Sequence, residues 1–363
     1  MFGNVYKDRK VLVTGNTGFK GTWLVLWLLK LGAKVVGYSL NIPSQPSLHE
    51  ILDLDFETIV ADVRDIQKLR QAIASFQPDI VFHSAAQSLV RRSYQYPVET
   101  FETNVMGTVN VFEACRQVGT VKVIVNITSD KCYENREWVW GYRENDPMGG
   151  HDPYSASKGC AELVTASYRR SFFPAEGYHK THQTLLASVR AGNIIGGGDW
   201  GEDRLVSDIM LAASQRKKVL IRNPDSIRPW QYVLEPLSGY LFLGQKLLEG
   251  KKGFAEAWNF GPGDEGHKDV LSVVRELQTH WPCIDVQIAS DEKNPHEATL
   301  LKLDCSKSHA KLEWKPIWNA SAMFAKTAQW YREFYESDRV LSQAHLDEYV
   351  NDAREKNMPW AVS

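Results

Sequence analysis

The sequence lacks the features that mark metal-binding, secreted or membrane proteins. Its five cysteines are an odd number without CxxC spacing, and no HExxH motif occurs among its ten histidines, so neither a disulfide framework nor a metal site is expected. The opening segment, residues 1–7, has no apolar signal core, and the apolar run Trp23–Leu29 is too short to cross a bilayer. These absences predict a soluble cytoplasmic protein with reduced thiols and no membrane partner.

An excess of charge of either sign is also missing. The chain has 42 Lys and Arg residues against 44 Asp and Glu, a formal net charge of -2, so no global basic field would attract nucleic acid. Apolar residues make up 43% and charged residues 24%, which is typical of a globular enzyme. At 363 residues, two lobes are expected. The twelve tryptophans could pack the core or stack on carbohydrate, and their number alone leaves both options open.

Short β-branched runs alternate with longer helical segments through the first half of the chain. The runs are apolar throughout, which is typical of parallel strands covered by helices on both faces. They occupy Val11–Val13, Lys34–Tyr38, Thr58–Val60, Asp79–Phe82 and Lys122–Ile127. The pattern predicts an α/β fold with a doubly wound parallel Rossmann sheet over residues 1–190.

Beyond residue 190 the pattern becomes irregular. It contains a glycine-rich loop, Gly196–Gly201, a strand-like segment, Ala257–Phe260, and a helical pattern from Asp269 to His280. We therefore expect a smaller lobe over residues 191–363, interleaved with the first domain through a segment near 235–265 that returns to it.

A glycine-rich turn directly follows the first predicted strand and opens the first helix. Gly15, Gly18 and Gly21 have GxxGxxG spacing, which permits a tight turn and a close approach of the backbone to a pyrophosphate. The N-terminus of the helix then offers free N–H groups to the phosphates. This placement favours a dinucleotide site over a merely structural turn. The turn also contains Thr17, Phe19 and Lys20.

The second strand does not end in the acidic residue that usually holds the ribose of NAD. The segment Tyr38–Asn41 has no carboxylate, and no Arg or Lys lies between Gly37 and Leu48 to neutralise the 2′-phosphate of NADP. The second absence favours NAD, with NADP as the alternative. Lys20 belongs either to this site or to the solvated start of the helix.

Tyr154 and Lys158 form a YxxxK pair at the start of a helical run. A spacing of four places the phenol and the ammonium on one helix face, and a nearby cation lowers the pKa of a tyrosine so that it can act as a base. Ser129 follows a predicted strand, where an open α/β sheet places its active crevice. By itself the pair could lie on the surface, but together with the glycine turn and Ser129 it indicates catalysis.

Ser129, Tyr154 and Lys158 resemble the catalytic triad of the extended short-chain dehydrogenase/reductase family. Further segments extend the resemblance over nearly the whole chain, and Thr128–Trp138 and Gly196–Trp200 narrow it to nucleotide-sugar 4,6-dehydratases of the kind that act on CDP-glucose. The further segments are Asp62-Val63, His83–Gln87, Asn104–Thr108, Arg190–Asn193, Arg228–Val233, Asn259–Gly261 and Asp304–Trp314.

The resemblance implies that residues 1–190 bind NAD and that residues 191–363 mainly bind the nucleotide sugar. It implies cofactor contacts by the glycine turn, Tyr154 and Lys158, together with Asp62, Val63, Ala85, Ala86, Gln87 and Asn104. It implies substrate contacts by Gln87, Asn193, Arg204, Arg228 and Asn259. His83, taken alone, is more typical of a core histidine.

The resemblance also implies a reaction, the conversion of CDP-glucose to CDP-4-keto-6-deoxyglucose and water in deoxysugar biosynthesis of the O-antigen type. Tyr154 would take the O4 proton while C4 gives hydride to NAD. Loss of the C5 proton would then expel water from C6, and the retained NADH would reduce C6. Related dTDP-glucose enzymes carry Thr-Asp-Glu where this chain has Ser129-Asp130-Lys131, so the C5 base is Lys131 or Asp130. In the favoured assignment Lys131 is the base or the stabiliser of the enolate, and Asp130 is the acid, which requires a raised pKa. A plain ion pair in a loop is the structural alternative.

Three other functions stay open at this point. They are a dehydratase of a GDP- or dTDP-sugar, a nucleotide-sugar 4-epimerase, which has no need of Asp130 and Lys131, and a non-catalytic Rossmann sensor. Members of the family commonly pair through a four-helix interface, here Pro97–Gln117 and Ala156–Phe173, which implies a homodimer or a dimer of dimers.

Overall fold

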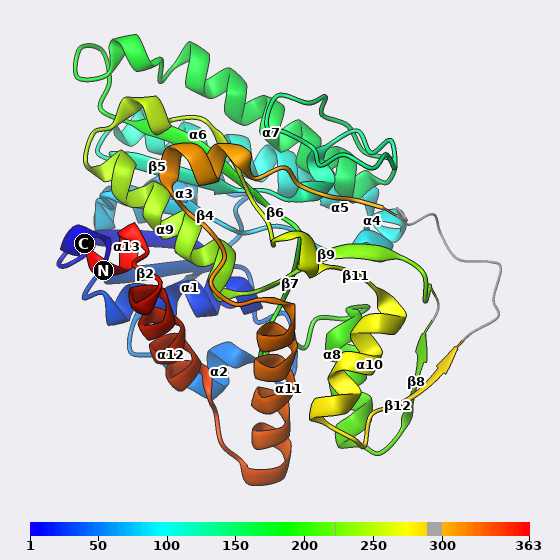
Figure 1. Ribbon diagram of the computed structural model, residues 1–363. Helices are drawn as coiled ribbons and strands as arrows, with labels where there is room; N and C mark the ends of the chain where they lie inside the picture. Colours follow the sequence, from blue (N-terminus) through cyan, green and yellow to red (C-terminus); the bar gives the residue numbers. More distant parts are fainter. Residues whose placement is uncertain (222, 289–299) are drawn as a thin grey trace.

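The computed structural model describes residues 1–221, 223–288 and 300–363. Its centre is a parallel seven-stranded sheet in the order β10-β6-β5-β4-β1-β2-β3 (Figure 1). The strands are β1 (Lys10–Thr14), β2 (Lys34–Ser39), β3 (Glu57–Val60), β4 (Ile80–His83), β5 (Val123–Ile127), β6 (Leu185–Ala191) and β10 (Ala257–Phe260). The strand order reverses between β1 and β4, beside which ligands bind in such sheets. The predicted doubly wound α/β fold is confirmed.

Helices cover both faces of this sheet because its strands are apolar on both sides. Val11 and Val13 of β1 belong to the core cluster that contains α1 and α9, whereas Leu12 belongs to the cluster on the opposite face with α3 and α6. The helices are α1 (Phe19–Lys30), α2 (Leu48–Leu52), α3 (Ile66–Phe76), α4 (Val90–Gln95), α5 (Pro97–Phe101), α6 (Gly107–Val118), α7 (Pro153–Ser171), α8 (Leu205–Ser214), α9 (Leu234–Leu248), α10 (Val270–His280), α11 (Ala320–Ser337), α12 (Ser342–Glu355) and α13 (Pro359–Val362).

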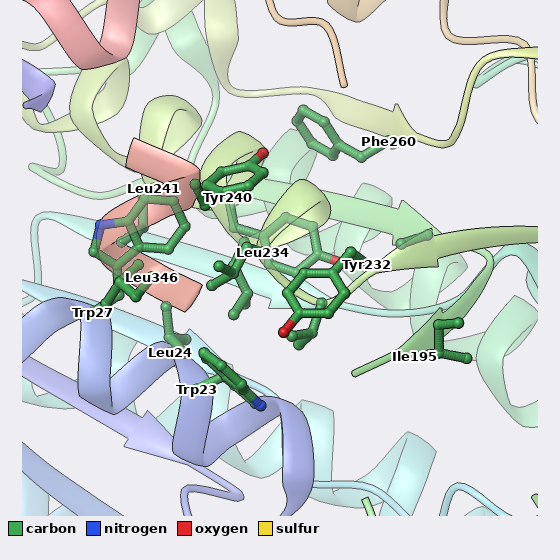
Figure 2. Packing of buried hydrophobic residues seen from close by; sticks show 14 of the residues in the cluster. Trp23, Leu24, Trp27, Ile195, Tyr232, Leu234, Tyr240, Leu241, Phe260 and Leu346 are labelled. Atoms are coloured by element: carbon green, nitrogen blue, oxygen red, sulfur yellow. The ribbon is translucent and has the colours of Figure 1, made fainter. Parts of the chain in front are cut away.

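The tryptophans serve chiefly the core. In the packing between α1 and α9, Trp23 and Trp27 of α1 lie close to Leu234 and Leu241 of α9, with Leu346 of α12 beside them (Figure 2). Six tryptophans have no exposed surface: Trp23, Trp27, Trp258, Trp314, Trp330 and Trp360. For these six, the alternative of carbohydrate stacking is excluded.

The two lobes are interleaved more extensively than the sequence pattern indicates. The segment near 235–265 contributes α9 and β10 to the larger lobe. The C-terminal helices also return, because the ring of Trp360 stacks on Phe2 at 5.1 Å between centroids and Tyr349 packs edge-on against Trp27. The two chain ends therefore lie side by side (Figure 1), and α12 and α13 pack on the sheet lobe although they fall within residues 191–363.

The smaller lobe contains two short sheets. One has the order β11 (His267–Asp269), β9 (Ile227–Tyr232), β7 (Asn193–Ile195), and the other pairs β12 (Asp285–Ile288) with β8 (Lys218–Ile221). Helices α8 and α10 lie beside them, at the right of Figure 1. Within residues 1–221, 223–288 and 300–363, no helix is long and apolar enough to cross a membrane.

Candidate active site

The glycine turn connects β1 to α1 and can be formed only by glycine at two of its three positions. Gly15 has a φ of +74°, and a Cβ on Gly21 would lie 2.1 Å from the Gly15 carbonyl oxygen. A Cβ on Gly18 would meet only that same oxygen, at 3.5 Å, so the turn is open on this side. The tight turn thus leaves the N-terminus of α1 accessible, as a bound pyrophosphate requires.

A cavity of about 770 Å³ runs from this turn to the smaller lobe. It brings together nearly all the site residues expected from the sequence, which come from both lobes. Those that line it are Gly15, Thr17, Gly18, Phe19, Lys20, Gly21, Asp62, Val63, Ala85, Ala86, Gln87, Ser129, Asp130, Lys131, Tyr154, Lys158, Asn193, Arg204 and Arg228. Among the described residues, no group of three His, Cys, Asp or Glu side chains could hold a metal ion.

The start of α7 places Tyr154 and Lys158 in the wall of this cavity. Asp152 caps the helix, its carboxylate accepting a hydrogen bond from the Ser155 backbone N–H at 2.9 Å, and Pro153 suits the first helical position. The cap fixes where the helix begins and therefore which face carries the pair. Both side chains are buried, with 8% and 6% of their surface exposed.

The expected lowering of the Tyr154 pKa is wrong for this structure. Burial raises the pKa of Tyr154 to about 12 and outweighs the opposing effects of the nearby Ser129 side chain and of the charge of Arg204. Burial also lowers the pKa of Lys158 to about 8. The helix spacing predicts that a cation lies near Tyr154, but it does not predict burial. Burial removes water and thereby disfavours both the Tyr154 phenolate and the Lys158 ammonium.

The turn after β5 holds Ser129, Asp130 and Lys131. It is a single turn of 3-10 helix, Asp130–Cys132, whose first N–H groups are capped by Ser129: the hydroxyl accepts from the Lys131 N–H at 3.2 Å and donates to Asp130 Oδ1 at 3.0 Å. Asp130 is 3% exposed, and burial raises its pKa even though Lys131, Ser129 and Arg228 oppose this. That direction is the one an acid requires. Lys131 is partly exposed and also faces the cavity.

Lys20 is a cavity residue, which excludes the alternative of a solvated lysine at the helix start. Its ammonium lies 6.0 Å from the ring centre of Tyr240 on α9. Burial, together with the charges of Lys158 and Arg204, lowers the pKa of Lys20 to about 7. Lys20, Lys158 and Arg204 therefore lie close enough to influence one another, and such a cluster of basic groups suits a diphosphate ligand.

Arg204 reaches across the cavity from the smaller lobe. Its guanidinium donates to Asp199 Oδ2 at 2.6 Å and to Ser88 Oγ at 3.4 Å. The backbone of Asp199 is held in turn by the Tyr331 hydroxyl, which accepts from the Asp199 N–H and donates to its carbonyl oxygen. The sequence reasoning missed Asp199, whose signal was the segment Gly196–Trp200.

Two of the expected residues lie outside the cavity. Asn104 is 2% exposed and binds the backbone of Gln87 in both directions, at 2.8 and 2.9 Å. Asn259 is fully buried, and its amide donates to the carbonyl oxygens of Tyr142 and Asp304. A direct substrate contact by Asn259 is therefore wrong, because β10 lies at the far edge of the sheet and its side chain is occupied there. Gln87 does line the cavity, but its amide is engaged internally.

His83 is a satisfied core histidine. Its Nδ1 lies 2.7 Å from Thr14 Oγ1 and its Nε2 lies 3.2 Å from Thr108 Oγ1. Burial lowers its pKa to about 3, so the ring is neutral.

Arg64 also lines the cavity and was not expected from the sequence. It lies beside Asp62, to which it donates from Nε and Nη2.

The fold and the site define a Rossmann-type enzyme architecture in which a dinucleotide-binding turn and a Tyr–Lys pair share one cavity. The family model described as GDP-mannose 4,6 dehydratase matches residues 12–327. The chain belongs to this family. It is 52% identical to the CDP-glucose 4,6-dehydratase of Salmonella typhimurium, over 96% of this chain and 98% of that protein.

More distant relatives extend to other nucleotide-sugar enzymes. The UDP-glucose 4-epimerase of Mycolicibacterium smegmatis is 28% identical over 89% of this chain and 98% of that protein. Among solved structures, the epimerase Mth375 of Methanothermobacter thermautotrophicus has a TM-score of 0.81 at 21% identity, over 94% of this chain and 96% of that one. These relatives share the fold.

Proposed function

We propose that this protein is an NAD-dependent 4,6-dehydratase that converts CDP-glucose to CDP-4-keto-6-deoxyglucose and water. The observation that carries the proposal is the cavity in which the Tyr154–Lys158 pair and the Asp130–Lys131 pair meet. The 52% identity to a CDP-glucose 4,6-dehydratase over nearly the whole chain supports the choice of substrate. The product places the enzyme in deoxysugar biosynthesis.

The residues around the glycine turn fit NAD. Gly15, Gly18 and Gly21 leave the first turn of α1 open toward a pyrophosphate, and Asp62 and Val63, which line the same cavity, would flank the adenine. When bound, NAD would supply the hydride acceptor at C4 and return the hydride at C6. The sheet lobe would hold this cofactor, and the smaller lobe would hold mainly the nucleotide sugar.

The protein's own groups move the protons. Tyr154 accepts the proton of the sugar O4, and Lys158, one helical turn away, stabilises the phenolate with its charge. The C5 proton is acidified by the new ketone and is removed by Lys131. Asp130, whose pKa is raised by burial, donates a proton to the C6 hydroxyl so that it leaves as water. Asp130 as the C5 base is the alternative assignment.

The cationic wall of the cavity suits the substrate's diphosphate. Arg228 is 9% exposed and lines the cavity together with Asn193. It lies close enough to Asp130 to oppose the rise in the pKa of that carboxyl. A buried guanidinium binds phosphate oxygens through two parallel hydrogen bonds. Arg204, aimed by Asp199, would contact the sugar from the other side.

The experiment that tests the function is an incubation with CDP-glucose and no added reductant. The expected result is a 4-keto-6-deoxy product without net consumption of NAD. A 4-epimerase would instead return a CDP-hexose that keeps its C6 hydroxyl, and a dehydratase of another nucleotide sugar would leave CDP-glucose unchanged while converting the GDP- or dTDP-sugar. A non-catalytic protein would convert none of them.

We further propose a homodimer that acts in the cytoplasm. Apolar side chains are exposed in both segments expected at the interface, Pro97–Gln117 and Ala156–Phe173, and include Val98, Met106 and Leu163, which are 69%, 50% and 60% exposed. The resemblance to the extended family assigns these two segments to a four-helix interface. Light scattering of the purified protein would distinguish the dimer from a dimer of dimers, and a monomer at all concentrations would contradict the proposal.

A further inference from the structure

Behind the cavity wall, a buried ion pair joins α7 to the central sheet. Arg190 on β6 donates from Nη2 to Glu162 Oε2 at 2.7 Å, and the two side chains are 4% and 3% exposed. Glu162 lies four residues after Lys158 and eight after Tyr154, so it falls near the same helix face. The ion pair therefore lies one helical turn beyond Lys158, close enough for the Glu162 carboxylate to act on the pKa of that lysine.

The carboxylate of Glu162 also reaches the start of the turn after β5. The hydroxyl of Thr128, the residue before Ser129, donates to Glu162 Oε1 at 2.5 Å, and Ser188 donates to Oε2 at 2.8 Å. Burial opposes the charge on Glu162, but the charge of Arg190 and these hydrogen bonds outweigh it and hold the pKa of Glu162 below its usual range. A charged carboxylate thus anchors one end of the turn.

The other end of the turn is anchored by Arg190. Its Nη1 donates to the hydroxyl of Tyr133 at 2.6 Å, and its guanidinium lies 4.9 Å from the centre of the Tyr133 ring. The Tyr133 hydroxyl donates onward to Asn259 Oδ1 at 2.8 Å. Asn259 is the residue paired with Arg190 in the register of β10 and β6. Tyr133 immediately follows the 3-10 turn Asp130–Cys132, so the turn is held at both ends.

We infer that Glu162, Arg190, Tyr133 and Asn259, called here the buried brace, are positioning residues that hold the turn 129–132 in register with Tyr154 and Lys158. The turn is too short to define its own geometry, whereas a hydrogen-bonded network in a dry interior is rigid and specific. The brace also accounts for the burial of Asn259 away from the cavity. The inference rests on the proposed function and deepens it, because the turn carries the elimination pair.

The brace should affect elimination more than oxidation. The cap and the helix period of α7 fix Tyr154 and Lys158 relative to each other without the brace. Asp130 and Lys131 depend on the turn, and a displacement of about 1 Å can slow a reaction on the order of a hundredfold. Loosening the brace should therefore leave the sugar oxidised at C4 but slow to lose water.

Two conservative variants loosen the brace while keeping its buried charges paired. Tyr133→Phe removes only the hydroxyl that links Arg190 to Asn259. Arg190→Lys keeps a cation opposite Glu162 but loses the planar fork that donates in two directions. Tyr142→Phe is the matched control, because its ring stacks on Tyr133 at 5.2 Å while its hydroxyl bonds only to Asn135 and the Arg136 N–H.

Two measurements follow for the holoenzyme. After rapid mixing with CDP-glucose, both brace variants should accumulate bound NADH, seen by its nicotinamide absorbance, and release product about tenfold to a hundredfold more slowly than wild type. Without substrate, the backbone amides of residues 129–132 should exchange hydrogen faster than in wild type. Tyr142→Phe should match wild type in both measurements.

Wild-type product release and wild-type amide exchange in both variants would overturn the inference. So would an equal loss of oxidation and product with a lowered melting temperature, since that pattern indicates general destabilisation. Wild-type protein that makes no product from CDP-glucose would contradict the proposed function instead, and the amide exchange would still decide whether the brace holds the turn.

Discussion

The start of α7 and the turn after β5 face the same cavity, but the first is shaped by neighbours in the sequence and the second by residues far away in the chain. Tyr154 and Lys158 are placed by a helix period and by a cap only two residues before Tyr154. Asp130 and Lys131 lie on a turn that is hydrogen-bonded at both ends to distant residues. Thr128 binds Glu162, 34 residues away in the chain, and Tyr133 binds Arg190, 57 residues away. The comparison teaches that local sequence is enough to fix Tyr154 and Lys158 relative to each other, whereas the geometry of the turn that carries Asp130 and Lys131 depends on long-range packing.

Burial acts on both regions in the same sense. It raises the pKa of Tyr154 to about 12 and raises the pKa of Asp130. A raised pKa suits a carboxyl that must donate a proton to a leaving hydroxyl, but a phenol with a high pKa is rarely ionised near neutral pH and is therefore rarely ready to accept a proton. The cations around Tyr154, including Arg204, therefore have to supply the stabilisation of the phenolate.

The largest effect is expected when the oxidation at C4 is disabled. Tyr154→Phe should lower turnover by about 10² to 10⁴, because it removes the acceptor of the O4 proton, while NAD binding stays nearly unchanged. Steady-state kinetics and a cofactor titration measure the two properties. Near-normal turnover by a folded variant would remove Tyr154 from the mechanism.

The next effect separates elimination from oxidation. Lys131→Met should still oxidise C4 but then stall, because the variant lacks the amine that removes the C5 proton in the favoured assignment, and product formation should fall on the order of a hundredfold. Bound NADH should accumulate after mixing with CDP-glucose. In heavy water, wild-type product should carry deuterium at C5, and the variant should exchange that position very slowly.

The outcomes of this variant distinguish the assignments. Dehydration at the wild-type rate would mean that the base lies elsewhere, with Asp130 as the remaining candidate on the turn. Failure to form NADH at all would move Lys131 from elimination to binding or to support of the Tyr154 phenolate.

A smaller effect is expected on substrate binding, with the balance between oxidation and elimination unchanged. Arg228→Ala should raise the Michaelis constant about tenfold or more with little change in turnover, because a contact to the diphosphate stabilises ground and transition states alike. Lys217→Ala, an exposed cation of the same lobe, is the control and should behave as wild type. An unchanged Michaelis constant for Arg228→Ala would place this residue outside the substrate site.

The smallest effect concerns stability alone and comes from Glu235 on α9. Its buried carboxyl accepts from the backbone N–H groups of Ile317 and Trp318 and from the Tyr349 hydroxyl, yet burial raises its pKa to about 7. A raised folded pKa contributes stability that is full below the unfolded pKa and is lost as pH rises through about 7.

Glu235→Gln removes this titration. The variant should melt a few degrees below wild type at about pH 5, and the difference should narrow toward about pH 8 as wild type loses the contribution. Calorimetry at several pH values measures it, and the ratio of NADH to product during turnover should not change. A difference that stays constant or widens with pH would contradict the direction of the Glu235 pKa.

Several features could be predicted because short stretches of sequence encode them. The strands of the first half have short apolar runs that are typical of a covered parallel sheet, and among them only the edge strand β3 is exposed at both ends. Gly15 and Gly21 could be identified from spacing, since the turn excludes any Cβ at both positions. The C-terminal return was not foreseen, because the contact of Trp360 with Phe2 joins opposite ends of the chain.

By itself, the sequence determined the doubly wound sheet, the glycine turn and the helix face that carries Tyr154 and Lys158, since strand and helix periods act over a few residues. Only the tertiary structure decided that Asn259 is buried behind the cavity, that Lys20 points into it and that the pKa of Tyr154 is raised. Each of these depends on which distant segments exclude water from a side chain, and that exclusion is a property of the packed molecule.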